Sequence, residues 1–240
     1  MVWLVLRGAQ EMGYHWQWYR VPRYIFSLDA GGFRPGPLLQ GLGVTLRITA
    51  LGLVLATALG LLTALMRLSN SFAARLLARG YLELIRNTPL LIQIFFLYFV
   101  LAPILEMEAF TAAVAALSLF EGAYASEIFR AGIVSIPRGQ WEVAYSSGLT
   151  PWHTYRRVIL PQAVRRMLPP LAGQAVNLVK DSALVSTIAI YDLTMQGQAI
   201  VARTFLAFEV WFTVAGIYLV VTLSLSWLVH QLERRLAVAQ

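Results

Sequence analysis

The chain has 240 residues, of which 58% are hydrophobic and 13% are charged, and its mean hydropathy is +0.65. A soluble domain carries about 25% charged residues, so this composition excludes a soluble globular protein and indicates a membrane protein. Arginines in cytoplasmic loops explain the net charge of +7 without a nucleic-acid partner, and the lack of cysteine excludes disulfides and thiolate metal sites.

The first 37 residues precede any predicted membrane span. Met1–Leu6 is too short for the hydrophobic region of a signal peptide, and Arg7 lies on the wrong side of it, so no cleavage is expected. The run His15–Phe26 mixes aromatic residues with arginine, as segments at a membrane surface do. We interpret residues 1–37 as a periplasmic, interfacial anchor, and contact with an external partner protein is the alternative.

The first span is predicted at residues 38–66, which is long enough to cross a hydrocarbon layer of roughly 30 Å. Small residues recur on it at every fourth position, namely Gly52, Ala56, Gly60 and Ala64. This spacing places them on one stripe of the helix, where a second helix can approach closely. We expect that helix to belong to the same chain.

The second and third spans are predicted at residues 88–105 and 110–133. The third span carries two acidic side chains, which are costly in a bilayer. Glu127 stands three residues before Arg130 on one helix face, so a local ion pair explains it. Glu121 has no partner of this kind.

A cytoplasmic loop of two short helices is predicted at about residues 135–165. The residues that mark its helix ends and turn are Pro137, Gly148, Thr150, Pro151 and Pro161. The first helix begins after the first of these prolines, and the glycine is free to take the left-handed conformation. The second helix begins with the threonine as N-cap and the next proline as first residue, and it is expected to end at Pro161. Helices this short need a partner surface to hold them.

The fourth span is predicted at residues 168–190 and the fifth at residues 210–229, so the two termini lie on opposite sides of the membrane. Basic residues concentrate in the segments 67–86, 130–166 and 234–235. Because cytoplasmic loops carry an excess of Lys and Arg, we expect the N-terminus outside and the C-terminal tail, residues 236–240, inside. The arginines of the N-terminal segment weaken this bias without reversing it.

Catalytic chemistry is absent from the sequence. His15, His153 and His230 are scattered, so no metal-ligand spacing occurs. The phosphate-binding pattern G-x-x-x-x-G-K-[ST] is missing, and the single lysine lies in the fourth predicted span. We expect no catalytic residue, metal or cofactor in this chain, and any ATP must be bound by another one.

Three motifs resemble those of ATP-binding-cassette importer permeases. Their loop pattern is Glu-Ala-Ala, three residues, Gly, nine residues and Ile-x-Leu-Pro, and it is matched here by Glu142, Val143, Ala144, Gly148, Val158, Ile159, Leu160 and Pro161. Valine replaces an alanine and an isoleucine of the pattern. Ile85–Phe96 (IRNTPLLIQIFF) and Lys180–Ala189 (KDSALVSTIA) are similar to the polar amino-acid branch of the family. The resemblance covers roughly residues 38–235.

The resemblance implies an all-α, polytopic type I importer permease fold with about five transmembrane helices in the bacterial inner membrane. The chain would be the permease subunit of an ATP-driven importer of polar amino acids, and not an enzyme. Its implied partners are a second permease copy or paralogue, an ATPase subunit that binds ATP and Mg, and an external solute-binding protein. The loop residues expected to couple to the ATPase are Glu142, Ala144, Gly148, Leu160 and Pro161.

Polar residues of the fourth span are candidates for the substrate path. A charge at mid-bilayer costs roughly 2.5 to 3.5 kcal/mol, so these residues need partners or water, and opposite charges beside an amide match an amino-acid zwitterion. The candidates are Thr88, Gln93, Asn177, Lys180, Asp181 and Ser182. The alternative is structural pairing of Lys180 and Asp181 with each other, with Glu121 or with Glu127.

A stand-alone secondary transporter or channel is the alternative function, since it would also place ionisable residues in the membrane. Five spans without an internal repeat are awkward for such a carrier. It would also give the two-helix loop no purpose.

Overall fold

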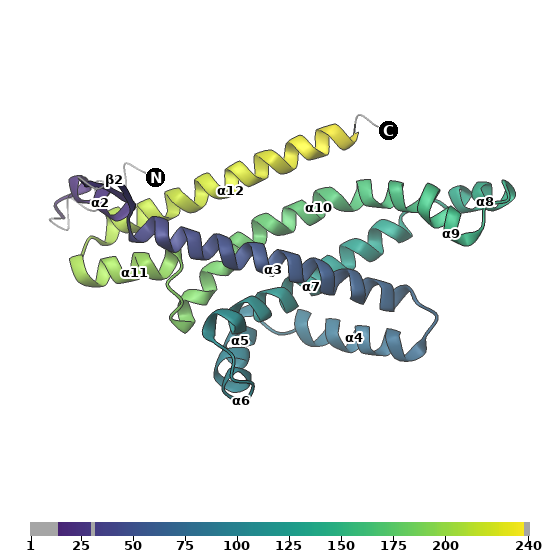
Figure 1. Cartoon of the computed structure of the whole chain (residues 1–240), viewed down its shortest axis with the longest axis horizontal. Helices are drawn as coiled ribbons and strands as arrows, with labels where there is room; N and C mark the ends of the chain where they lie inside the picture. The colour runs from purple at the N-terminus through teal and green to yellow at the C-terminus, as the bar shows by residue number, and fades with distance from the viewer. Residues whose placement is uncertain (1–13, 30–31, 238–240) are drawn as a thin grey trace.

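The computed structural model describes residues 14–29 and 32–237, which are mostly helical (Figure 1). In chain order the elements are η1 (Trp18–Arg20), α2 (Pro22–Ile25), β1 (Phe26–Asp29), β2 (Gly32–Pro35), α3 (Pro37–Leu68), α4 (Phe72–Arg86), α5 (Leu90–Phe95), η2 (Phe96–Leu101), α6 (Ala102–Ile104), α7 (Ala109–Val134), α8 (Arg138–Ser146), α9 (Pro151–Thr154), η3 (Tyr155–Ile159), α10 (Leu160–Asp181), η4 (Ser182–Ile188), α11 (Leu193–Thr204) and α12 (Ala207–Ala237). The predictions for Met1–Leu6, and for residues 238–240 of the tail, lie outside the described residues.

Three helices in the described part of the chain are long and apolar enough to cross a membrane: α3, α7 and α12 over Ala207–Arg235. They coincide with the first, third and fifth predicted spans. The second predicted span lies in the second arm of a bent pair, in which α4 and Leu90–Ile104 meet at 105°. The fourth lies in α10 and η4, and α10 is less apolar because it carries arginines, Lys180 and Asp181.

The small-residue stripe of α3 packs against α7, which crosses it in the bundle (Figure 1). A Cβ atom on Gly60 would lie 2.7 Å from the Cβ of Ala125 and 3.0 Å from the carbonyl oxygen of Gly122. A side chain there would therefore push the two helices apart. The stripe serves packing within the chain, as predicted.

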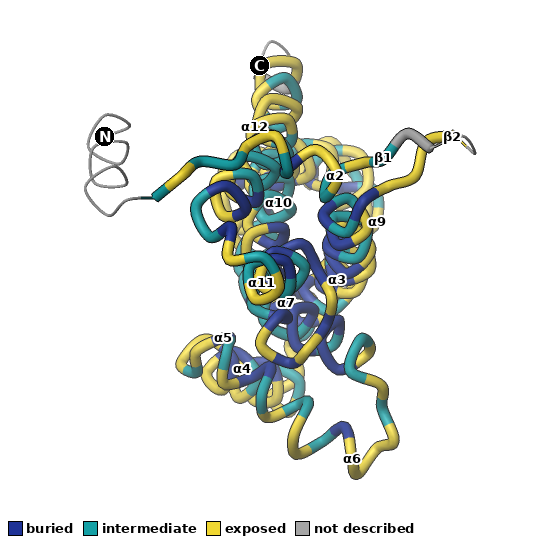
Figure 2. The backbone as a smooth tube through the Cα atoms, turned by 90° about the vertical axis from the view of Figure 1, so that its left-hand side faces the viewer, coloured by how far each residue is buried: buried dark blue, intermediate teal, exposed yellow. Residues whose placement is uncertain are grey.

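The main apolar core lies where α3, α5, α7, α10 and η4 meet. Its largest members are Ile48, Ile94, Leu117, Leu178 and Val185, all nearly inaccessible. Burial of such a side chain contributes about 1.5 to 3 kcal/mol to stability. Buried residues gather in this central part of the bundle (Figure 2). In contrast, the most apolar stretch of α12 is only 6% buried within the chain.

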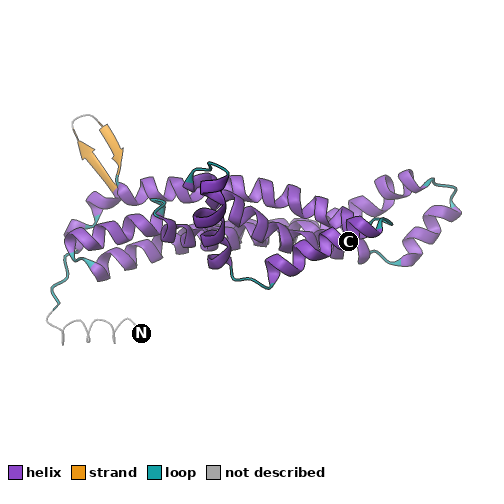
Figure 3. Cartoon of the chain, turned by 90° about the horizontal axis from the view of Figure 1, so that it is seen from below, coloured by secondary structure: helices purple, strands orange, loops and turns teal. Residues whose placement is uncertain are grey.

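The N-terminal segment is fastened to the start of α12. The Tyr14 hydroxyl and the Gln17 backbone N–H, the latter at 2.6 Å, donate to the carboxylate of Glu209, which is fully buried. The chain then forms a two-stranded antiparallel hairpin, β1 and β2, that stands out from the helices (Figure 3). The rest of the described chain is helical and confirms the predicted all-α class. The hairpin is the one departure from that class in the described residues.

The second helix of the cytoplasmic loop does not end at Pro161, and that prediction is wrong. From Pro151 the helix passes through a wide π-helical stretch, η3, directly into α10. Pro161 sits in the first turn of α10, where a missing N–H is tolerated. The wider turn changes the hydrogen-bonding register just ahead of the proline, and the chain stays helical through it.

Candidate functional site

The turn between α8 and α9 is closed by hydrogen bonds of its own backbone. Leu149 N–H donates to the Ala144 carbonyl at 3.1 Å and Gly148 N–H to the Tyr145 carbonyl at 3.0 Å, which is the Schellman arrangement. Gly148 has φ +74°, and the Thr150 side chain caps α9 by accepting from the His153 N–H at 3.4 Å. The predicted left-handed glycine and N-cap are confirmed.

The inner face of this loop is held on the ends of α7 and α10. Ile136, Ile159, Ala163 and Met167 form a buried apolar cluster there. Arg166 donates to the backbone carbonyl of Ser135 at 2.6 Å, and Trp141 packs edge-on against Tyr155 with centroids 4.9 Å apart. The loop is therefore a fixed projection of the bundle, at the end of the molecule where α8 and α9 lie in Figure 1.

The outer face of the loop presents apolar side chains with nothing packed over them. Val143 is 68% and Trp152 67% exposed. Glu142 is exposed and makes no hydrogen bond or ion pair with any residue that the structure describes. Of the other predicted docking residues, Leu160 and Pro161 are exposed and Ala144 is buried. Exposed anchors ringed by charge are what a protein partner binds.

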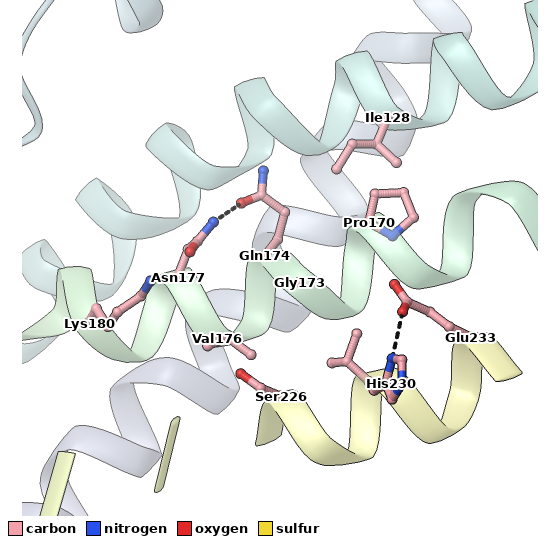
Figure 4. Close-up of a pocket in the computed structure, with 11 residues that line it drawn as sticks. Ile128, Pro170, Gly173, Gln174, Val176, Asn177, Lys180, Ser226, His230 and Glu233 are labelled. Carbon is pink, nitrogen blue, oxygen red and sulfur yellow. Dashed lines mark hydrogen bonds and ion pairs between the residues drawn. The ribbon is translucent and has the colours of Figure 1, made fainter. Parts of the chain in front are cut away.

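A polar groove of about 640 Å³ lies between α10 and α12, close to the end of α7 (Figure 4). Its polar side chains are Gln174, Asn177 and Lys180 from α10 and Ser226, His230 and Glu233 from α12. The Asn177 amide donates to the Gln174 side-chain oxygen at 3.5 Å, and His230 Nδ1 lies 3.3 Å from Glu233 Oε2. The groove therefore offers an ammonium, a carboxylate and neutral hydrogen-bonding groups along one surface.

The predicted path residues of α10 and η4 divide between two surfaces. Asn177 and Lys180 line the groove. Asp181 instead interacts electrostatically with Glu121 of α7, which is one of the structural pairings considered from the sequence. Ser182 is buried and donates to the Val179 carbonyl at 2.7 Å.

Thr88 and Gln93 support the bend between α4 and α5 and do not line the groove. The Gln93 amide donates to the carbonyls of Ile85 at 2.8 Å and Thr88 at 2.9 Å. The Thr88 hydroxyl donates to the Leu84 carbonyl at 2.9 Å. The bonds to Leu84 and Ile85 satisfy carbonyl groups that the end of α4 leaves without helical partners, and the bond to Thr88 holds the turn that follows.

The proximity of Glu121 to Asp181 was one of the alternative pairings considered from the sequence, although no helical spacing pointed to it. Glu121 is 3% exposed, and an ionised carboxylate only accepts hydrogen bonds. The Oε2 atom of Glu121 makes no hydrogen bond with any residue that the structure describes.

Four residues that line the groove were not predicted from the sequence: Gln174, Ser226, His230 and Glu233. Gln174 lies one helical turn before Asn177, and this spacing was a usable signal. His230 and Glu233 follow the predicted end of the fifth span and were passed over for that reason. In the described chain, no group of three or more His, Cys, Asp or Glu side chains is placed to hold a metal.

Comparison with known proteins identifies relatives along most of the chain. The family described as "Binding-protein-dependent transport system inner membrane component" matches residues 56–238. The glutamine transport system permease protein GlnP of Escherichia coli K12 is 42% identical over 204 residues, covering 84% of this chain and 93% of that protein. The L-cystine transport system permease protein TcyB of Bacillus subtilis is 40% identical over 203 residues, covering 83% and 87%.

Solved structures share the fold. A crystal structure of an amino acid ABC transporter with histidines is 40% identical in sequence and superposes with a TM-score of 0.78, covering 83% of this chain and 94% of that one. The inward-facing MetNI methionine ABC transporter superposes with a TM-score of 0.68 at 20% identity, covering 83% and 96%. The second likeness concerns the fold alone.

Proposed function

Since the chain belongs to the family of binding-protein-dependent transport system inner membrane components, and is thus a membrane-spanning permease component of an ABC importer, we propose that its cargo is a polar amino acid. The relatives named for glutamine and cystine and the solved amino acid transporter support this class of cargo. The groove supports it as well, because it carries Lys180 near the amide of Asn177 at one end and the Glu233 carboxylate at the other (Figure 4).

The projecting loop is the observation that carries the proposal of ATP coupling. Its outer face is apolar and exposed, while its inner face is fastened to α7 and α10. A partner that grips the loop therefore moves two bundle helices. We assign the partner as an ATPase subunit that binds ATP and Mg, with Glu142, Gly148, Leu160 and Pro161 at the contact and Ala144 packed beneath it.

The complete importer contains a second permease copy or paralogue and an external solute-binding protein. The chain lies in the bacterial inner membrane with its N-terminus outside and its C-terminus in the cytoplasm, which follows from the distribution of arginine. Nucleotide binding closes the ATPase pair and moves the loops, and the permease pair then opens outward. The N-terminal segment, residues 1–37, contacts the outer surface of this inner membrane.

Reconstitution tests the proposal and its rival together. The chain is placed in liposomes alone, or with its ATPase and solute-binding partners, and uptake of a panel of labelled amino acids is measured with and without ATP. We expect uptake of polar amino acids only in the complete, ATP-supplied system. Transport by the lone chain would instead establish a secondary carrier or channel.

A further inference from the structure

Three arginines from three helices converge on one carboxylate away from the polar groove. Glu127 Oε1 lies 2.8 Å from Arg67 Nη1 and 3.1 Å from Arg86 Nη1, and Glu127 Oε2 lies 3.3 Å from Arg130 Nη2. We call Arg67, Arg86 and Arg130 the arginine triad. The single local ion pair expected from the sequence, between Glu127 and Arg130, is therefore only one side of a larger cluster.

Glu127 does not satisfy the triad, either in charge or in hydrogen bonds. One carboxylate leaves two positive charges uncompensated at this point. Three guanidinium groups carry about fifteen N–H donors, whereas a carboxylate offers about four acceptor positions. Arg67 Nη1 lies 2.8 Å from Glu127 Oε1 but makes no hydrogen bond with any residue that the structure describes. The cluster thus lacks acceptors and negative charge together.

The more accessible members of the triad are oriented for a further ligand. The side chains of Arg86 and Arg130 are 45% and 35% exposed, against 20% for Arg67. The guanidinium of Arg86 also lies over the ring of Tyr124, 5.8 Å from its centre, which restrains its plane. Planar, restrained guanidinium groups bind phosphate oxygens in pairs.

We propose that the arginine triad binds the headgroup phosphate of an anionic phospholipid. The triad sits near the ends of α3 and α4 and within α7, and both α3 and α7 are long and apolar enough to cross a membrane, so a lipid headgroup can reach it. Apolar residues of α4, Leu77 and Leu84, are 67% and 69% exposed and provide surface for acyl chains. Basic pockets between membrane helices hold anionic headgroups in this way. The site is separate from the projecting loop and does not depend on which solute is carried.

Lipid binding to the full-length protein in a neutral detergent tests the assignment. Native mass spectrometry measures retention of phosphatidylglycerol and of phosphatidylcholine, with inorganic phosphate as a competitor. We expect a saturable preference for phosphatidylglycerol that Arg86→Gln and Arg130→Gln each weaken by about tenfold, since a charge-assisted phosphate contact contributes about 1.4 kcal/mol or more.

Two further variants distinguish a lipid site from an internal ion-pair cluster and from unspecific attraction to basic surface. Glu127→Gln removes the competing carboxylate and should strengthen phosphatidylglycerol binding several-fold, whereas a purely internal ion-pair cluster predicts no gain. Arg79→Gln removes an exposed arginine elsewhere on α4 and should leave binding unchanged. Equal losses with Arg79→Gln, no gain with Glu127→Gln, or full displacement by millimolar phosphate would each overturn the assignment.

Discussion

Gly148 is the residue on which the shape of the projecting loop depends. Its φ of +74° places it in the left-handed region, and the open space around it means that the backbone, not crowding, selects glycine. A β-branched residue there costs roughly 1 to 2 kcal/mol locally. The cost falls on the turn that joins α8 to α9, and therefore on the surface offered to the ATPase.

We expect Gly148→Val to reduce both co-purification of the ATPase and ATP-driven uptake. Gly139→Ala is the matched control, because Gly139 lies in α8 with open space around it and an ordinary φ. Alanine there favours the helix by up to about 1 kcal/mol. Co-purification and uptake are measured for both variants, and normal behaviour of Gly148→Val would remove the loop from the coupling path.

Asp192 gives the fold a dependence on pH. It caps α11 by accepting from the Met195 N–H at 2.8 Å, and it is fully buried. Burial raises the pKa of Asp192 from 3.8 to about 6. The folded state therefore binds this proton more tightly than the unfolded chain, and the stabilisation is full below about pH 4 and is lost as the pH rises through about 6.

Asp192→Asn should remove the loss of stability at higher pH, because the amide oxygen still caps the helix and the amide carries no charge. The stability of the wild type relative to this variant should fall by up to about 3 kcal/mol between pH 4 and pH 8. Thermal unfolding in detergent at several pH values measures the difference. Asp192→Ala, which also loses the cap, should be less stable than Asp192→Asn by about 1 kcal/mol throughout, and a pH-independent difference for Asp192→Asn would refute the assignment.

At the scale of elements, α10 presents two surfaces with different tasks. Asn177→Ala alters the groove alone, so uptake or substrate preference should change while assembly and basal ATP hydrolysis persist. Asp181→Asn retains a hydrogen-bonding side chain beside Glu121 and removes a charge from the helix interface. Whether the complex still assembles with Asp181→Asn decides between a role of Asp181 in the substrate path and a role in folding.

Uptake, ATPase rate and complex yield are measured for each variant. Gln198→Ala, at an exposed position on α11, is the control for loss of a polar side chain. If both Asn177→Ala and Asp181→Asn lose the assembled complex without a selective transport defect, these residues serve folding and the cargo binds elsewhere.

Elements whose cause is local were predictable from the sequence. Gly148 and Thr150 act on their immediate neighbours, and the stripe on α3 follows from helical spacing. The interaction of Glu121 with Asp181 was one of several pairings considered, and the attachment of Gln17 to Glu209 was not expected. Both join residues far apart in the chain, so no periodicity reveals them. Pro161 was misjudged because its effect depends on the hydrogen-bonding register of the preceding turn.

At the scale of the whole molecule, the hairpin and the projecting loop occupy opposite ends of the bundle (Figure 3). The lack of cysteine allows single labels without background. Ser27→Cys should react with an impermeant maleimide from outside the cell, and Ser146→Cys only after permeabilisation. The reverse labelling pattern would contradict an external N-terminus.

The π-helical stretch η3 also has a mechanical consequence. Because the helix continues through it without a break, Pro151 to Asp181 is one helical run with a contour length of about 45 Å at 1.5 Å per residue. The proposed ATPase contact lies at one end of it and Lys180 at the other. Pro169 and Pro170 interrupt the hydrogen bonds of this run near its middle, which makes the helix softer to bending there. A force on the loop would then tilt the half of the helix that adjoins the loop. A rotation about the helix axis would still reach the end that carries Lys180.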